Sequence, residues 1–277
     1  MNNNLLRFAD SKVYFRCPIC TKSMDMQGNS LICRNRHCFD ISRYGYVNLL
    51  LKSPPKTNYS KQSFNNRHQV LEYGMYDVVL EKITQFISDT PSIKSILDVG
   101  CGEGFYARQV QQRTARRIFA FDLSKEAIQI ASKKDKCKVV NWFIADLSKI
   151  PLKDGSMDCI LDIFSPAHYK EFQRLLSSNG YVIKVIPTKN HLREIRTKVV
   201  AHLKNPDYSN QSVIEYFEKY LKTISRETVS ATIQLSPEQR MSFIEMTPLL
   251  FCVEKDSINW DTLTHLTIEA EVLIGTY

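Results

Sequence analysis

The chain lacks the long apolar segments that membrane proteins and secreted precursors carry. No run approaches the roughly 18 consecutive apolar residues that a membrane-spanning helix needs, so no membrane association is expected. Residues 1–10 contain no apolar core of a signal peptide. Internal repeats and low-complexity tracts are also missing, which excludes solenoid and fibrous architectures. The composition that remains is typical of globular proteins.

The cysteines lack the even spread of a disulfide framework. Four of the eight crowd into positions 17–38, and the others are scattered through apolar segments. Such crowding indicates metal binding in a reducing compartment, so we expect a cytoplasmic protein. For the scattered ones we expect buried positions, as for other small apolar side chains: Cys101, Cys137, Cys159 and Cys252.

Acidic residues are scarce in the first quarter of the chain. Residues 1–70 hold eleven Lys or Arg and three Asp or Glu, a net charge of +8, whereas residues 71–277 hold twenty-six of each. The basic excess favours a polyanionic partner, most simply nucleic acid, over a merely solvated surface. The arginines that we expect at RNA phosphates are Arg34, Arg36, Arg43 and Arg67.

A zinc site is indicated within this basic region. The pattern is Cys17-Pro-Ile-Cys20, twelve residues, and then Cys33-Arg-Asn-Arg-His37-Cys38. Three thiolates and one imidazole, or four thiolates, can close a tetrahedron around Zn²⁺, and spacing alone leaves His37 and Cys38 both open. Turns are expected at Pro18 and at Gly28-Asn29. About forty residues bury too little surface to fold alone, so the metal would stabilise this module.

Strand and helix patterns alternate from residue 94 onward, after a helical periodicity over 68–88. We expect strands at 94–99, 117–122, 139–144, 157–163, 180–186, 223–234 and 264–276, and helices at 104–113, 124–134, 168–177 and 237–246, with 189–221 mostly helical. This order predicts an α/β fold, the seven-stranded, Rossmann-like sheet of class I methyltransferases. The predicted division is a zinc-binding RNA-recognition module at 1–42, a connector at 43–67 with an extended Ser53-Pro-Pro55, and a methyltransferase domain at 68–277.

The strand at 94–99 runs into Gly100-Cys-Gly-Glu-Gly104, and a helix is expected to begin at Phe105. Glycines let such a loop approach a cofactor closely. Asp122 ends the next strand and can accept hydrogen bonds from a ribose, and Asp146 ends the third and can meet an adenine amino group. A dinucleotide is the rival cofactor, but Glu103 would repel its pyrophosphate, which favours S-adenosylmethionine. The cofactor residues predicted are Asp98, Gly100, Gly102, Gly104, Asp122, Leu123, Asp146 and Leu147.

Five strings in fixed order carry a family resemblance: C-P-x-C, C-x-x-x-H-x-F-D, G-Y-V-N-L-L, L-D-V-G-C-G-E-G and M-T-P. Over essentially its whole length the chain resembles the bacterial 23S ribosomal RNA guanine-N1 methyltransferases of the RlmA type. The resemblance implies zinc ligands Cys17, Cys20, Cys33 and His37, with Cys38 at a variable position. It also implies S-adenosylmethionine, a homodimer whose paired zinc modules form an RNA cleft, and one of two neighbouring guanines in hairpin 35 as the target.

The chain departs from that family at two places. It has Arg67-His68 where the family has Arg-Arg, and Phe164-Ser-Pro166 where the family has Tyr-Ala-Pro. Both lie where substrate is expected, so they bear on the choice of guanine rather than on the class of reaction.

Guanine N1 carries a proton at neutral pH, so methyl transfer to it requires a base or a hydrogen-bond acceptor. Ligands of open α/β sheets lie beyond the carboxyl ends of the strands, where the loop 162–168 is expected. We therefore predict Asp162 as the first catalytic candidate and His168 as the second, against plainer roles as a strand-end cap and a helix-start residue. Phe164 is expected to stack on a flipped-out base. Two alternatives remain: a small-molecule methyltransferase with a structural zinc module, and a non-catalytic nucleic-acid-binding protein.

Overall fold

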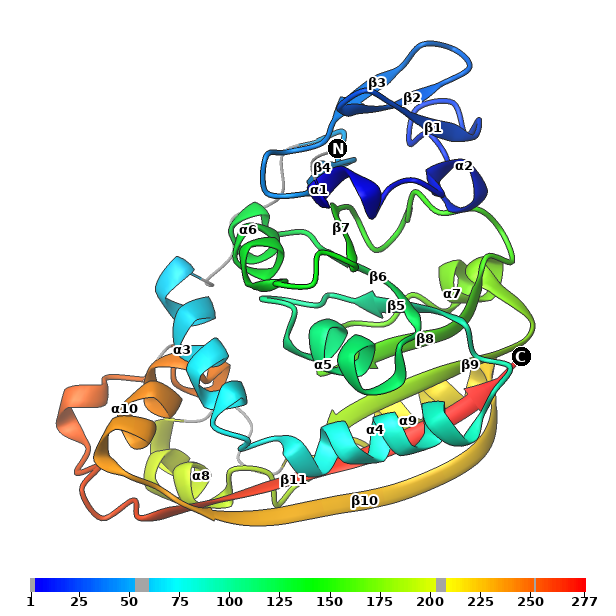
Figure 1. Cartoon of the computed structure of the whole chain (residues 1–277). Coiled ribbons are helices and arrows are strands. Elements are labelled where there is room, and N and C mark those ends of the chain that lie inside the picture. The colour runs from blue at the N-terminus through cyan, green and yellow to red at the C-terminus, as the bar shows by residue number, and fades with distance from the viewer. Residues whose placement is uncertain (1–2, 53–59, 203–207, 252) are drawn as a thin grey trace.

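An eight-stranded sheet organises the chain in the computed structural model, which describes residues 3–52, 60–202, 208–251 and 253–277 (Figure 1). Its order is β10-β11-β9-β8-β5-β6-β7-β4. The strands are β4 (Tyr46–Asn48), β5 (Ser95–Val99), β6 (Arg117–Asp122), β7 (Asn141–Ile144), β8 (Met157–Ile163), β9 (Leu176–Pro187), β10 (Lys222–Gln234) and β11 (His265–Thr276). β11 runs antiparallel to both of its neighbours, β9 and β10, and the other pairings are parallel.

The seven strands predicted from the sequence are all present, with ends shifted by a few residues. The eighth, β4, was not predicted as a strand, because its three residues lie in the segment read as a connector. Tyr46 and Val47 are buried, and the segment pairs in parallel with Trp142 to Ile144. The connector thus extends the eight-stranded sheet at its edge. The expected extended unit at 53–55 lies outside the described residues.

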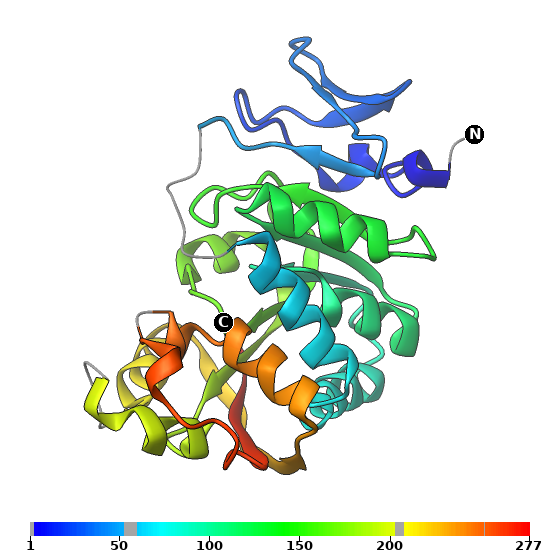
Figure 2. The same cartoon turned by 90° about the vertical axis from the view of Figure 1, so that its left-hand side faces the viewer.

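Helices cover both faces of the sheet (Figures 1 and 2). They are α3 (Lys61–Glu72), α4 (Asp77–Asp89), α5 (Phe105–Thr114), α6 (Lys125–Lys134), α7 (Tyr169–Leu175), α8 (Arg193–Val199), α9 (Gln211–Tyr220) and α10 (Pro237–Met246). One apolar core joins α3, α4, α5, α6, α8 and α10 to one face of the sheet, and a second joins α7, α9 and the N-terminal segment to the other. No helix among the described residues has the length and apolar character that crossing a bilayer requires.

The helix predicted over 68–88 is in fact two helices. Gly74, with φ of +75°, turns the chain between α3 and α4, and a Cβ there would lie 2.7 Å from a carboxylate oxygen of Asp77. The apolar periodicity continues through the turn, which is why the sequence pattern concealed it. The break leaves α3 beside α10, where the Ser242 hydroxyl donates to Gln69 over 3.2 Å (Figure 2).

The N-terminal segment combines a small ribbon with a base that packs on the main sheet. Two short helices, α1 (Asn3–Leu6) and α2 (Ser11–Tyr14), precede the three-stranded sheet of β1 (Met24–Gln27), β2 (Ser30–Cys33) and β3 (Cys38–Asp40). The predicted turn at Gly28-Asn29 joins β1 to β2. Phe8 and Phe15 are fully buried, and the Phe15 ring lies 5.8 Å from that of Phe119 in β6.

The scattered cysteines are only partly buried as expected. Cys159 is buried, but Cys101 is half-buried and Cys137 is exposed, and Cys252 lies outside the described residues. Cys137 lies in the loop between α6 and β7, in a turn whose neighbours Lys136 and Lys138 are also exposed. For Cys137 the expectation was wrong.

Candidate functional sites

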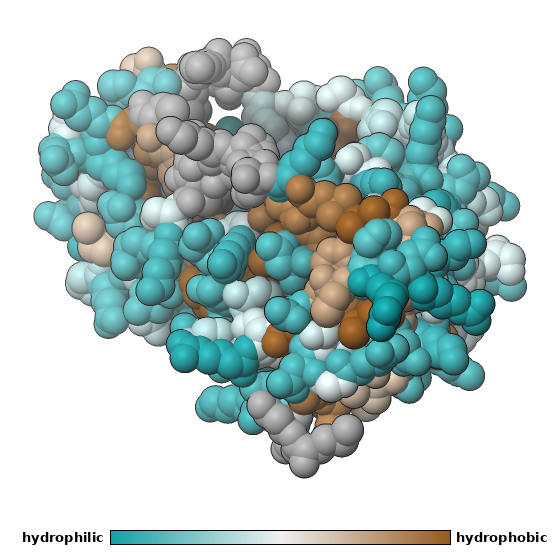
Figure 3. All heavy atoms as spheres, turned by 90° about the horizontal axis from the view of Figure 1, so that it is seen from above, coloured by the Kyte–Doolittle hydropathy of each residue, from teal (hydrophilic) through white to brown (hydrophobic). Residues whose placement is uncertain are grey.

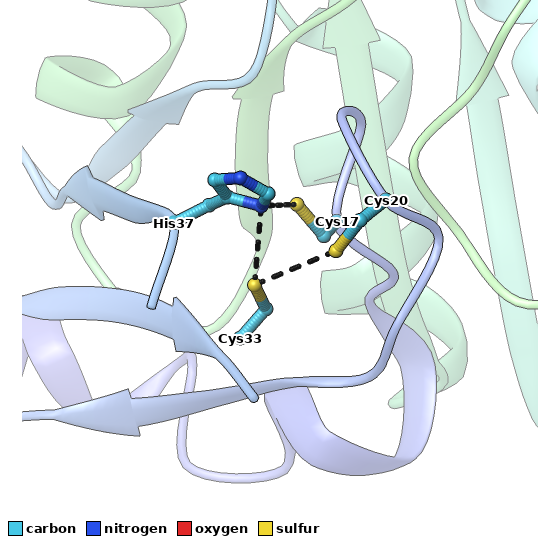
Figure 4. Close-up of side chains that lie close together, drawn as sticks. All are labelled: Cys17, Cys20, Cys33 and His37. Atoms are coloured by element: carbon cyan, nitrogen blue, oxygen red, sulfur yellow. Dashed lines mark hydrogen bonds between the residues drawn. The ribbon is translucent and has the colours of Figure 1, made fainter. Parts of the chain in front are cut away.

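Four side chains at the tip of the ribbon converge as metal ligands do (Figure 4). The Nδ1 atom of His37 lies 3.4 Å from the Sγ atoms of both Cys17 and Cys33, and the Sγ atoms of Cys20 and Cys33 are 3.7 Å apart. A tetrahedral zinc ion with S and N ligands at about 2.3 and 2.1 Å places two sulfurs about 3.8 Å apart and a sulfur about 3.6 Å from a nitrogen. The four ligand atoms therefore fit one Zn²⁺.

Two tight turns bring these ligands together. Backbone N–H groups of Thr21 and Arg36 donate to the carbonyls of Cys17 and Cys33, and both donor residues have positive φ. Cys38, the competitor for the fourth position, begins β3 with an exposed side chain and is not part of the cluster. The arrangement favours His37, as the resemblance implied.

The second site is a cavity of about 490 Å³ at the carboxyl ends of β5, β6 and β7. The strand order reverses between β5 and β8, and ligands of open α/β sheets lie at such a switch point. Six of the eight predicted cofactor residues line it: Gly100, Gly102, Asp122, Leu123, Asp146 and Leu147. The rest of the wall includes Phe64 and Arg67 of α3 and the loop residues Phe164, Ser165 and Pro166.

The two aspartates are held by backbone groups. Asp122 accepts hydrogen bonds from the N–H of Gly102 over 2.9 Å and of Ser124 over 2.8 Å. Burial raises the pKa of Asp122, and these donors oppose the rise. Asp146 accepts from the N–H and the hydroxyl of Ser148, and these bonds lower its pKa. Both carboxylates are thus fixed in direction at the wall of the cavity.

Asp98 and Gly104 lie outside the lining but shape the loop. Gly104 has φ of +79°, and a Cβ on it would lie 2.4 Å from Trp142, so glycine is required. Asp98 is 2 % exposed, and its Oδ2 has no hydrogen-bond partner among the described residues. Burial raises the pKa of Asp98 to about 8. A buried carboxyl with an open oxygen fits a cationic ligand group such as an ammonium or a sulfonium.

Glu103 does not face the cavity, contrary to the position assumed for it from the sequence. Its Oε2 lies 3.1 Å from Nδ1 of His68 and 3.3 Å from a guanidinium nitrogen of Arg108. Burial alone would raise the pKa of Glu103, but His68 and Arg108 lower it below its ordinary value. These contacts tie the glycine loop to α3 and α5, which explains His68 as a structural residue.

The predicted catalytic residues lie beside the cavity but do not line it. Asp162 is fully buried, with one oxygen 2.8 Å from Nζ of Lys184 and the other accepting from the Ser165 hydroxyl over 2.5 Å. Burial raises the pKa of Asp162 to about 6 against the opposing charge of Lys184. His168 caps α7, where its Nδ1 accepts from the N–H of Glu171. His168 thus has the plainer role of a helix-start residue, and both oxygens of Asp162 are engaged within the protein; a catalytic role for either residue stays a prediction.

The loop that Asp162 anchors carries Phe164 in an uncommon backbone conformation. Its φ is +52°, a region that L residues seldom adopt, and its N–H donates to Val185 over 3.0 Å. Phe164 lines the cofactor cavity and two neighbouring cavities. Phe164 thus lies at the wall of this cavity, and its stacking on a flipped-out base stays a prediction.

The arginines predicted for RNA occupy two regions. Arg34, Arg36 and Arg43 are exposed on the N-terminal segment, and Arg67 lines the cofactor cavity. Not all basic residues of the first quarter face solvent. Arg7 is buried against Asp135 and Arg16 is paired with Asp154, at 3.3 and 3.1 Å.

Comparisons with known proteins agree with both sites. The family model described as "RlmA, N-terminal" matches residues 15–55, and the one described as "Methyltransferase domain" matches residues 96–184. The Bacillus subtilis (strain 168) protein named "Putative 23S rRNA (guanine-N(1)-)-methyltransferase YxjB" is 35% identical over 285 residues, covering 94% of this chain and 96% of its own. The "23S rRNA (guanine(748)-N(1))-methyltransferase" of Streptomyces fradiae is 24% identical, covering 93% and 91%.

Solved structures support the fold alone. One chain of the complex between the Haloferax volcanii Trm112 methyltransferase activator and a methyltransferase aligns with a TM-score of 0.52 at 15% identity. The alignment covers 80% of this chain and 99% of that one.

Proposed function

The chain belongs to the RlmA-type 23S rRNA (guanine-N1)-methyltransferases, and on that basis we propose that it methylates N1 of a guanine in hairpin 35 of 23S ribosomal RNA. The observation that carries the proposal is the 35% identity to the B. subtilis relative across both the ribbon and the methyltransferase domain. A small-molecule enzyme or a non-catalytic binding protein would not be expected to share both parts in this order.

S-adenosylmethionine, when bound, supplies a methyl group on a cationic sulfonium. Asp122 is proposed to accept hydrogen bonds from its ribose, and Asp146 and Leu147 are proposed to border its adenine. Asp98, buried behind the lining, is proposed to favour the cationic end of the cofactor through the charge of its ionised carboxyl. Phe64 and Arg67 limit access of water from the side of α3. These residues bind and orient the donor, and in-line geometry then accounts for most of the catalysis.

We propose that Asp162 acts by positioning. Its two oxygens hold Lys184 and Ser165, and the Ser165 hydroxyl oxygen also lies 2.9 Å from the carbonyl oxygen of Val99. This network fixes the loop that carries Phe164 against the end of β5. The target guanine must arrive unpaired, because N1 is engaged in Watson–Crick pairs.

The zinc ribbon is proposed to orient the RNA through Arg34, Arg36 and Arg43. Phosphate contacts of this kind position a substrate without reading its sequence. The choice of guanine would then belong to the methyltransferase domain, and guanine 748, which names the S. fradiae relative, is the first position to examine.

A homodimer is proposed as the active form. Large hydrophobic side chains are exposed on the N-terminal segment, among them Val13 at 60% and Ile19 at 51%. Viewed from that side, hydrophobic surface is exposed within a hydrophilic border (Figure 3). Light scattering on the full chain tests this, and a monomer at assay concentration would contradict it.

The function is tested by incubating the full chain with a hairpin 35 transcript and S-adenosylmethionine carrying a labelled methyl group. Mass mapping of the product should give 1-methylguanosine at a single position, and Asp122→Ala serves as the cofactor-deficient control. Methylation of the base at another atom, or none with a protein that binds S-adenosylhomocysteine, would refute the proposal.

A further inference from the structure

A second cavity, of about 250 Å³, adjoins the cofactor cavity. Arg67 and Phe164 line both, so the two share a wall at the place where α3 faces the loop after β8. The volume is below the roughly 300 Å³ at which pockets for drug-sized ligands begin, which suits a single base. Met246, Thr247 and Pro248, the M-T-P string, form part of its far side.

The Tyr106 hydroxyl gives this cavity an unused polar group. Tyr106 lines the cavity and is 5% exposed, and its hydroxyl has no hydrogen-bond partner among the described residues. A buried hydroxyl without a hydrogen-bond partner carries a free-energy cost. The cost is avoided if a ligand supplies the partner.

A second hydroxyl is oriented toward the same cavity. The N–H of Glu269 lies 3.3 Å from Nδ1 of His191, which makes Nδ1 an acceptor and leaves the proton on Nε2. Nε2 lies 3.4 Å from the Tyr76 hydroxyl oxygen, so it donates to that oxygen. The hydroxyl proton of Tyr76 is then free to donate to a ligand. Burial lowers the pKa of His191 to about 4, which keeps this arrangement neutral at pH 7.

Aromatic rings supply flat walls. Phe164 and His191 stack with centroids 5.8 Å apart, and Tyr76 meets Phe164 edge-on at the same distance. Arg67 adds a positive charge at the shared wall. Hydroxyl donors, a cation and aromatic faces together match a purine whose exocyclic oxygen accepts hydrogen bonds and gains negative charge when N1 loses its proton.

We propose that this cavity is the pocket for the flipped-out guanine, with the Tyr106 and Tyr76 hydroxyls hydrogen-bonded to the base edge and His191 positioning Tyr76. This inference rests on the proposed function and names the part of the chain that recognises the base. The cavity on the other side of the Phe164 loop, lined by Tyr169, is the competing location.

The chain offers a matched control. Tyr169 is also buried, at 1% exposure, and its hydroxyl also has no partner among the described residues, but it lines the competing cavity. Tyr106→Phe and Tyr169→Phe thus remove the same kind of group from two different cavities.

The experiment measures steady-state methylation of the hairpin and, separately, S-adenosylhomocysteine affinity by calorimetry, on the full chain. Tyr106→Phe and Tyr76→Phe should each lower kcat/KM for RNA about tenfold with cofactor affinity unchanged, and Tyr169→Phe should change neither. His191→Gln should lower kcat/KM for RNA in the parent protein but cause no further loss in the Tyr76→Phe variant. A histidine with a purely structural role would lower kcat/KM in both proteins.

Three outcomes would overturn the pocket. The first is a lower kcat/KM for RNA in Tyr169→Phe while kcat/KM in Tyr106→Phe is unchanged. The second is a loss of cofactor affinity in Tyr106→Phe. The third is full methylation activity in both Tyr106→Phe and Tyr76→Phe. A parent that binds S-adenosylhomocysteine but never methylates the hairpin would instead refute the proposed function, and the pocket with it.

Discussion

In the zinc ribbon, three strands of four, four and three residues meet at a cluster of four ligand atoms. In the methyltransferase domain, eight strands carry an apolar core on each face. The ribbon alone has little to bury, so we expect its order to depend on a bound metal, whereas the larger domain is stabilised by burial. The two regions therefore respond to different perturbations.

Charge divides the regions in the same way. The net +8 belongs to residues 1–70, and residues 71–277 are neutral overall. Part of this positive charge is neutralised within the protein, because Arg7 and Arg16 form ion pairs with Asp135 and Asp154 of the larger domain. The base of the N-terminal segment is thus joined to the catalytic domain. Deletion of residues 1–40 would remove Phe8 and Phe15 together with the ribbon and would expose the apolar side chains that Phe15 packs against, Phe119 and Phe143.

The largest expected effect follows loss of a zinc ligand. Apparent zinc binding stabilises small modules by about 10–16 kcal/mol, so Cys33→Ser should release the metal, expose residues 17–42 to proteolysis and abolish RNA binding. S-adenosylhomocysteine affinity should be unchanged because that site lies in the other region. Metal content, limited proteolysis and calorimetry check the three parts.

Cys38→Ser is the matched control for that prediction. Cys38 is exposed and lies outside the cluster, so the variant should retain one zinc per chain, whereas His37→Ala should weaken binding. Metal content that followed Cys38 rather than His37 would show the fourth ligand to be misassigned.

The second effect belongs to the neutral region. Asp122→Ala removes a charged acceptor from the cofactor cavity and should weaken S-adenosylhomocysteine binding by roughly 1.5–3 kcal/mol. Asp122→Asn keeps the shape and one acceptor for the loop N–H groups, so its loss should be smaller. Zinc content should not change in either variant, and an unaltered affinity in Asp122→Ala would argue against this cofactor site.

The contrast also explains what the sequence could predict. Ligand spacing at 17–37 and the glycine loop at 100–104 are local signals, because a turn or a close approach restricts residue type directly. Cys17, Cys20 and Cys33 and six residues of the cofactor lining were predicted in this way, whereas the choice of His37 over Cys38 came from the family resemblance. The strand alternation likewise predicted the seven strands of the domain.

Tertiary contacts accounted for what was missed. β4 is only three residues long, and its pairing with β7 depends on a partner nearly 100 positions away. The break at Gly74 places Tyr76 in the second cavity, although the apolar period runs on without interruption. Asp162 was predicted as a base or hydrogen-bond acceptor from its place at the end of a strand, and the sequence pattern could not show that Lys184 and Ser165 occupy its oxygens.

A smaller effect concerns pH and the core of the larger domain. Burial and the charge of Arg196 lower the pKa of His191 from 6.5 to about 4. As the pH falls, His191 is protonated in the unfolded chain before it is protonated in the folded one. The free energy of unfolding that this histidine contributes above pH 6.5 is therefore lost as the pH falls toward 4. Between pH 7 and 5.5 this loss should be about 1.2 kcal/mol.

His191→Gln removes the titrating group and should flatten that part of the stability profile. Urea unfolding followed by tryptophan fluorescence at the two pH values measures the difference. A parent and a variant with equal pH dependence would show that His191 does not titrate as its burial requires.

The smallest effect returns to the charged region. Arg34→Glu and Arg36→Glu should each weaken RNA binding across sequences and lower the slope of log affinity against log salt by about one unit per lost phosphate contact. Arg43→Glu is a less direct test, because Arg43 also donates to the Tyr44 hydroxyl over 2.6 Å.

Lys222→Glu, an exposed charge at the start of β10, is the matched control and should leave the slope unchanged. Both arginine variants should keep their zinc and their cofactor affinity, so that a weaker complex reports lost phosphate contacts rather than lost structure. Equal effects from Lys222→Glu would mean that total charge, and not the placement of charge on the ribbon, governs binding, and the contrast between the two regions would then not extend to RNA recognition.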